Sequence, residues 1–170
     1  MAIVKATYTK KSAGAKASIR YIEHRPGKDG EKITRTLFGS DGAMGRYQAN
    51  QMIDEAEKGS IFFRIVISPD PTQEDRAKDL HLREITEKTM HTLEERLHKQ
   101  IAWVAAEHND HAPHRHVHIV AIVPGRLQVQ DFQLLRQTAT EAALFQRHER
   151  DLLQQHKEQE REREEAQWER

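Results

Sequence analysis

Polar and apolar positions along this chain follow two different periods, and the two periods predict strands and helices in succession. Apolar residues alternate with polar ones, or run together for a few residues, in segments typical of β-strands. Those segments are 2–8, 32–38, 60–67, 100–108 and 115–123, and a further short strand is expected at 126–130. Apolar residues recur instead at three- and four-residue steps in helical segments, which are 13–24, 46–58, 73–98 and the stretch from 131 onward. The run at 60–67 is the most continuous, and we expect it to be a central strand with both faces covered.

Histidines gather just before the last long strand. Five of them fall within the eleven residues 108–118, and a run of β-branched and aliphatic residues follows directly. Because side chains alternate faces along a strand, His114, His116 and His118 share one face, each about 6–7 Å from the next. The opposite face, from Val117 to Val123, is apolar and suited to a core.

Imidazole is the commonest metal ligand in proteins, and this cluster has a spacing that suits a metal site. The strand at 100–108 ends in His108, and a loop short enough to join antiparallel strands leads into the next one. That arrangement brings His108 near His116 and His118, so that three imidazoles can cap one side of a divalent ion. The competing interpretation is a solvated sheet face, or a His-rich tract that binds metal adventitiously. The clustering of His-x-Asp and His-x-His at the start of an apolar strand favours the functional interpretation.

Charge is spread unevenly, although the formal net charge is zero. Residues 1–50 hold ten Lys and Arg against four Asp and Glu, an excess compatible with phosphate binding or with a solvated surface. We expect a folded domain at 1–131 and a highly charged helical extension at 132–170. The absence of cysteine excludes disulfides and thiolate ligands. No apolar run approaches the ~20 residues that span a bilayer, and no secretory signal is visible, so we expect a soluble, cytoplasmic protein.

A metal held by three histidines can stabilise charge during a displacement at phosphorus, and such a reaction needs a nucleophile. With no cysteine and no Gly-x-Ser-x-Gly turn, the candidates are Tyr8, Tyr21 and Tyr47. A phenol has a pKa of about 10 in water, so it needs a cation or a metal nearby. Tyr21 has the most basic surroundings in the sequence. The competing interpretation of any of the three is a packing residue with its hydroxyl at the surface.

Two segments together carry a resemblance to a known family. The segment 15–25 reads Ala-Lys-Ala-Ser-Ile-Arg-Tyr-Ile-Glu-His-Arg, and downstream come His108-x-Asp110 and His116-Val-His118-Ile-Val. In this combination, over roughly residues 1–125, the chain resembles the relaxases, the mobilisation nucleases of plasmids and integrative elements in the HUH endonuclease superfamily. The part between the two segments is also similar to that family, with Phe-Phe-Arg-Ile-Val-Ile-Ser-Pro, a long helix, and Trp-Val-Ala-Ala-Glu-His.

The resemblance implies an α+β fold, with a central antiparallel sheet, helices packed on it and the site exposed on one face. It implies that Tyr21 attacks one strand of single-stranded DNA at an origin of transfer, stays joined to the 5′ phosphate and frees a 3′ hydroxyl. His108, His116 and His118 match the family's metal triad, which holds Mg²⁺ or Mn²⁺. Asp110 matches the acidic residue that orients a histidine or activates the tyrosine.

The choice of histidines leaves one alternative open. Pro113-His114-x-His116 also fits the family pattern, which makes His114 an alternative ligand. Val117 supplies a buried anchor between His116 and His118, and this favours His116 and His118 over His114 and His116 as the ligand pair. His114 then contacts DNA phosphate or supports a ligand from behind. The other residues expected to make salt-dependent phosphate contacts are Lys5, Lys16, Arg20 and Arg25.

Two other function classes compete with the relaxase. A rolling-circle replication initiator or a single-strand transposase shares the metal site but usually places its tyrosine after the His motif, whereas no tyrosine follows Tyr47 here. A non-enzymatic DNA- or metal-binding module would lack the covalent step. The order of the tyrosines favours a relaxase, for which accessory mobilisation proteins are further expected partners.

Overall fold

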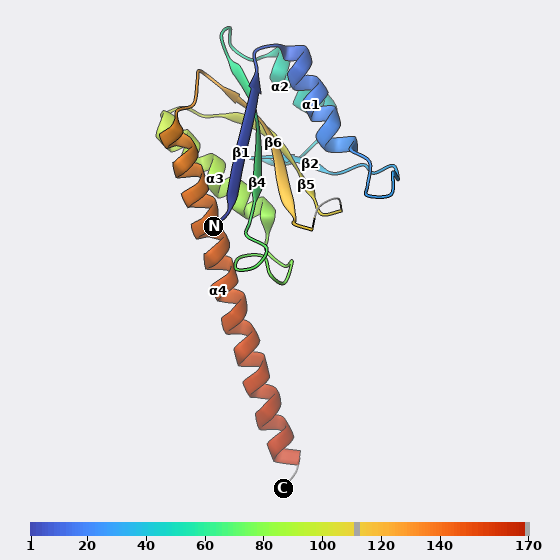
Figure 1. Ribbon diagram of the computed structural model, residues 1–170, viewed down its shortest axis with the longest axis vertical. Coiled ribbons are helices and arrows are strands. Elements are labelled where there is room, and N and C mark those ends of the chain that lie inside the picture. Colours follow the sequence, from blue (N-terminus) through green and yellow to red (C-terminus); the bar gives the residue numbers. More distant parts are fainter. Residues whose placement is uncertain (111–112, 169–170) are drawn as a thin grey trace.

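The computed structural model describes residues 1–110 and 113–168, and its centre is one six-stranded sheet with helices on both faces (Figure 1). The strands are β1 (Ile3–Thr9), β2 (Leu37–Gly39), β3 (Gly42–Met44), β4 (Ile61–Ser68), β5 (Ala102–His108) and β6 (His116–Val123). The helices are α1 (Ser12–His24), α2 (Arg46–Asp54), α3 (Leu82–Leu97) and α4 (Val129–Trp168). The predicted α+β fold with an antiparallel sheet is confirmed.

The strands lie in the order β1-β4-β6-β5-β2-β3, and every neighbouring pair is antiparallel. β4 is therefore an inner strand, between β1 and β6, as its apolar sequence predicts. The residues from Ile61 to Ile67 at odd positions are buried on one face, and Phe62 is buried on the other. The expectation that both faces are covered is wrong at Arg64, which is exposed.

Two separate cores lie on the two faces of the sheet. α3 and the first part of α4 pack on one face, with Leu93, Leu135 and Ala139 fully buried against the sheet. α1 and α2 cover the other face, where Ile19 and Ile53 pack on residues of β4, β5 and β6. Because α1 crosses β1, β4, β5 and β6, its last turn is held close to the ends of β5 and β6 where the histidines lie.

The helix α4 is longer than the body on which it packs, and its second half projects away from the sheet (Figure 1). The last buried side chain of α4 is that of Arg147, which pairs with Asp79 and Asp151. From Leu152 to Trp168 the side chains are all exposed. In the described part of the chain, no helix combines the length and the apolar character that crossing a membrane requires.

Several predicted boundaries are wrong for local reasons. The helix expected to start at residue 73 starts at Leu82, because the Asp70 and Asp75 carboxylates accept backbone hydrogen bonds in the preceding loop and hold it in turns. The strand expected at 126–130 is absent. Instead the Asp131 carboxylate accepts the Gln128 backbone N–H at 2.7 Å, and α4 begins at Val129.

The strand expected at 32–38 is reduced to β2, which forms a hairpin with β3 and meets β5 only at Phe38 and Ala105. Residues ahead of β2 leave the sheet because the Arg35 backbone N–H bonds to the carbonyl oxygen of Glu23 in α1. The helix expected at 46–58 ends four residues earlier, at Asp54.

Candidate metal centre

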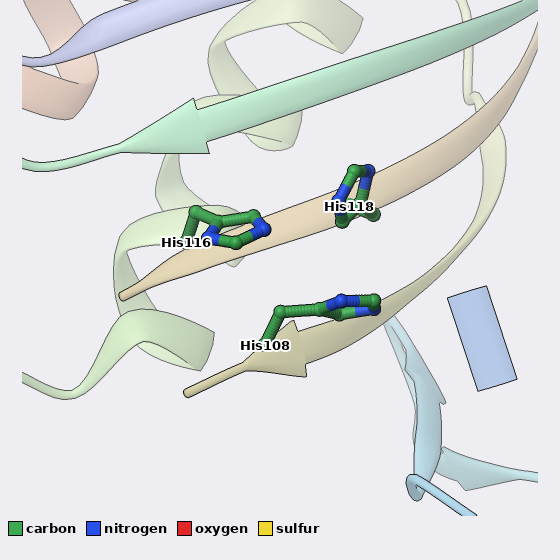
Figure 2. A group of neighbouring side chains, drawn as sticks. All are labelled: His108, His116 and His118. Carbon is green, nitrogen blue, oxygen red and sulfur yellow. The ribbon is translucent and has the colours of Figure 1, made fainter. Parts of the chain in front are cut away.

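The antiparallel pairing of β5 and β6 brings three histidines together. His108 lies directly opposite His116 in the ladder, and Ala106 lies opposite His118. Figure 2 shows the three rings on the same side of the two strands. Their centroids are 5.3 Å apart for His108 and His116, 4.5 Å for His108 and His118, and 4.9 Å for His116 and His118. One nitrogen of each ring lies within 4.8 Å of the other two, so the group could bind a metal ion.

Hydrogen bonds to carbonyl oxygens determine which ring nitrogens carry protons. His108 Nε2 lies 2.9 Å from the Ile22 carbonyl oxygen and must donate to it, which leaves a lone pair on Nδ1. His116 Nδ1 lies 3.1 Å from the His114 carbonyl oxygen and donates in the same way, which leaves Nε2 free. These bonds fix two of the three tautomers in a form that can bind a cation.

Two ring nitrogens in this group are buried without a hydrogen-bond partner among the described residues. They are His108 Nδ1 and His118 Nε2. A buried polar atom without a partner costs free energy, and native structures seldom leave one unsatisfied without a reason. A divalent cation would satisfy both nitrogens, so the donor set fits a metal.

Burial keeps these rings neutral near pH 7. Desolvation lowers the pKa of His108 to about 3 and that of His118 to about 4, and it also lowers the pKa of His116. The neighbouring imidazoles and the Arg35 guanidinium add to the effect by opposing a second positive charge. Neutral imidazole is the form that binds metal, so this environment favours coordination at physiological pH.

Tyr21 lies beside this group. It begins the last turn of α1, and its ring meets the His118 ring edge-on, with centroids 6.3 Å apart and planes at 87°. The Arg25 guanidinium carbon lies 5.7 Å from the centroid of the Tyr21 ring. Tyr21 is half exposed, and it lines a pocket of about 220 Å³ together with His118.

The two other tyrosines lie elsewhere. Tyr8 in β1 packs against Phe63, which belongs to the core on the opposite face of the sheet. Tyr47 is the second residue of α2 and is 82% exposed. Of the three candidates, Tyr21 alone lies against one of the grouped histidines.

Asp110 and His114 lie close to the group without joining it. The Asp110 carboxylate accepts two hydrogen bonds from Arg35 Nη2, at 2.9 and 2.8 Å, and this guanidinium lowers the pKa of the carboxyl. No hydrogen bond joins Asp110 to a histidine in the described part of the chain. His114 is exposed and precedes β6, and it contributes its backbone carbonyl oxygen to His116. The structure thus brings together the preferred three histidines rather than the set containing His114.

The predicted phosphate-binding residues are distributed around the same side of the sheet. Lys5 in β1 lines the pocket beside Tyr21, and Arg20 and Arg25 lie on either side of Tyr21 in the chain. Lys16 differs from them because its ammonium group is paired with the Asp54 carboxylate at 2.6 Å.

Two arginines of the site were missed by the sequence interpretation. Arg64 is the single charged residue in the apolar run of β4, and that isolation was a usable signal. It lines the Tyr21 pocket and donates from Nε to Thr7 Oγ1 at 3.0 Å. Arg35 gave no local signal, because it stands in an alternating segment and reaches Asp110 only through the tertiary fold.

Comparison of the chain with models of protein families, with curated proteins and with solved structures finds no match. The fold and the site define an α+β protein with a candidate three-histidine metal centre, next to a half-exposed tyrosine that shares a pocket with His118.

Proposed function

We propose that this protein is a metal-dependent, site-specific nuclease that nicks single-stranded DNA through a covalent tyrosine intermediate, as relaxases do in plasmid or integrative-element mobilisation. The observation that carries the proposal is the contact between Tyr21 and His118. Tyr21 and His118 line the same pocket, and His118 belongs to the group of three neutral imidazoles, although the phenol comes from a distant part of the chain. A tyrosine and a metal at one phosphate are the two components that such a displacement requires.

The proposed reaction exchanges one phosphate ester for another. The Tyr21 hydroxyl oxygen attacks the phosphorus atom and loses its proton, while the bond from phosphorus to the 3′ oxygen breaks. The 3′ oxygen takes up a proton and leaves as a hydroxyl, and the 5′ phosphate stays on Tyr21. A bound Mg²⁺ or Mn²⁺ would supply a Lewis acid that stabilises negative charge on the phosphate. The energy of the ester is kept, so a 3′ hydroxyl can later reverse the step.

The proposed substrate is single-stranded DNA from an origin of transfer. Lys5, Arg20 and Arg25 form no ion pair among the described residues, so their charges are free to meet phosphates near Tyr21. We further propose that the protein acts in the cytoplasm, where the DNA of a mobile element is found, together with accessory mobilisation proteins.

Trapping the intermediate tests the proposal. The full-length protein is incubated with Mn²⁺ or Mg²⁺ and a pool of random-sequence single-stranded oligonucleotides labelled at the 3′ end. A 5′-phosphotyrosine keeps the 3′ part of the strand on the protein, so the label should remain with the protein on a denaturing gel. Denaturing capture and sequencing of the joined strands then identifies the cleavage sequence.

Matched tyrosine variants assign the nucleophile. Tyr21→Phe should abolish the adduct while leaving DNA binding intact, and Tyr47→Phe should form as much adduct as the unchanged protein. An adduct that survives Tyr21→Phe and disappears in Tyr47→Phe would show that the nucleophile is misassigned. DNA binding without an adduct, with either metal, would instead favour the non-enzymatic binding module.

A further inference from the structure

We infer that Arg35 is a positioning residue, which holds the helix bearing Tyr21 against the strand bearing His108, and that Asp110 acts by anchoring Arg35. This inference rests on the proposed function. It assigns Asp110 a different action from the expected one on a histidine or on the tyrosine itself, because its carboxylate is occupied by the guanidinium.

Arg35 joins the two halves of the site with one side chain. Its Nη1 donates to the Arg25 carbonyl oxygen at 2.7 Å, and its Nη2 donates to both oxygens of Asp110. Arg25 is the C-terminal cap of α1, which contains Tyr21, and Asp110 follows shortly after His108 at the end of β5. The Arg35 side chain is only 7% exposed, so the guanidinium has little surface left for DNA.

The carbonyl oxygens at the end of α1 explain why this connection sets the position of Tyr21. The last carbonyl groups of a helix have no partner within the helix and must find donors elsewhere. At the end of α1 those donors come from the site. His108 Nε2 bonds to the Ile22 oxygen, Arg35 N bonds to the Glu23 oxygen, and the guanidinium bonds to the oxygen of the cap residue. Tyr21 therefore lies in a helical turn whose end is fixed by His108 of β5 at one point and by Arg35 at two.

Lysine cannot replace this guanidinium. An ammonium group carries the same charge but lacks the planar fork that reaches a carbonyl oxygen and both oxygens of a carboxylate together. Arg35→Lys should preserve the charge near the histidines and remove the side-chain connection between the end of α1 and Asp110. A displacement of about 1 Å between reacting groups can slow a reaction by about 100-fold. The loss of positioning should therefore lower the cleavage rate and leave the DNA affinity unchanged.

The experiment compares Arg35→Lys with Arg147→Lys in the full chain. Arg147 is a matched control, because it is another buried arginine that pairs with carboxylates, those of Asp79 and Asp151, and it lies in α4 on the opposite face of the sheet. We expect Arg35→Lys to lower kcat at least about 10-fold, with KM and Mn²⁺ affinity within about 3-fold of the unchanged protein. Arg147→Lys should leave all three values near those of the unchanged protein.

A measurement that does not depend on cleavage separates this inference from the proposed function. Nuclear Overhauser contacts between the ring protons of Tyr21 and His118 should be present in the unchanged protein and in Arg147→Lys, and weakened or lost in Arg35→Lys. Contacts and kcat that both survive Arg35→Lys would overturn the inference, as would a rise in KM alone. If the unchanged protein forms no adduct, the proposed function fails while the ring contacts still test the position of Tyr21.

A double variant tests the part assigned to Asp110. If Asp110 acts only through Arg35, Asp110→Asn should lower kcat in the unchanged protein but add less than about 2-fold to the effect of Arg35→Lys. If the fold-reductions in kcat caused by the two substitutions multiply in the double variant, Asp110 has an independent role and this part of the inference is overturned.

Discussion

The ring of Tyr21 meets the ring of His118 edge-on, at a centroid distance of 6.3 Å and an interplanar angle of 87°. One residue belongs to α1 and the other to β6, so the contact depends on how the helix packs across the sheet. The ring nitrogen His118 Nε2 is buried and has no hydrogen-bond partner among the described residues. Metal binding, acid stability and DNA affinity should all depend on the groups gathered around this contact.

Divalent metal should stabilise the fold through the three histidines. A ligand that binds only the folded state at about one hundred times its Kd adds about 2.7 kcal/mol to the free energy of unfolding. We expect Mn²⁺ to raise the melting temperature in a concentration-dependent manner. Differential scanning fluorimetry measures the melting temperature, and isothermal titration calorimetry measures the Mn²⁺ affinity. His118→Asn should lose most of this gain. His156→Asn, on the exposed part of α4, should keep it, and equal stabilisation of both variants would contradict the assigned site.

Acid should destabilise the metal-free protein more than the exposed histidines alone would explain. Burial lowers the pKa of His108 to about 3 and that of His118 to about 4, from an ordinary value of 6.5. The unfolded chain thus takes up protons on these rings near pH 6.5, whereas the folded protein does not until much lower pH. Stability is fully present above pH 6.5 and falls as the pH drops towards 4, by up to about 1.4 kcal/mol per pH unit for each ring.

Urea denaturation of metal-free protein between about pH 7 and pH 5 measures this effect before most carboxylates titrate. His118→Asn should make the free energy of unfolding less dependent on pH in that window, and His156→Asn should leave the dependence unchanged. If both variants retain the full dependence, the buried imidazoles are not its source.

The salt dependence of DNA binding should distinguish lysine side chains that form no ion pair among the described residues from those that are paired with a carboxylate. Each phosphate contact to a single strand contributes about 0.7 to the slope of log affinity against log salt concentration. Lys5→Gln should reduce the slope by about this amount, because Lys5 lines the Tyr21 pocket and forms no ion pair among the described residues. Lys16→Gln should change it less, because its ammonium group is bound to Asp54. Fluorescence anisotropy with a labelled single strand measures both slopes, and an unchanged slope in Lys5→Gln would remove this residue from the interface.

Removal of the projecting part of α4 should cost little stability. From Leu152 onward the side chains of the described residues are exposed, whereas Leu135 and Ala139 are fully buried in the core. A chain ending at Leu153 keeps the pairs made by Asp151, and its free energy of unfolding should stay within about 1 kcal/mol of that of the full chain. Leu135→Ala should instead cost about 2–5 kcal/mol. Chemical denaturation compares the two, and a large loss on truncation would show that the projecting helix has a structural role.

The sequence by itself determined that His116 and His118 share a strand face, and it indicated that His108 lies near them. Alternation along a strand has a strict period of two residues, so His116 and His118 had to share a face once residues 115–123 were assigned to a strand. The short connection after His108 then favoured an antiparallel neighbour, and the register confirms this pairing with His108 opposite His116. Local chain geometry is enough for such predictions, because every residue involved lies in two adjacent strands.

Only the tertiary structure decided what surrounds the histidines. The late start of α3, the short β2 and the occupation of Asp110 by Arg35 all depend on hydrogen bonds between groups whose pairing no periodicity encodes. The same holds for Tyr21, which reaches His118 because α1 packs across the sheet with Ile19 and Ile22 buried beneath it. A hydrophobic pattern specifies which face of a helix is buried, but the position and angle at which it packs come from the shape of the whole core.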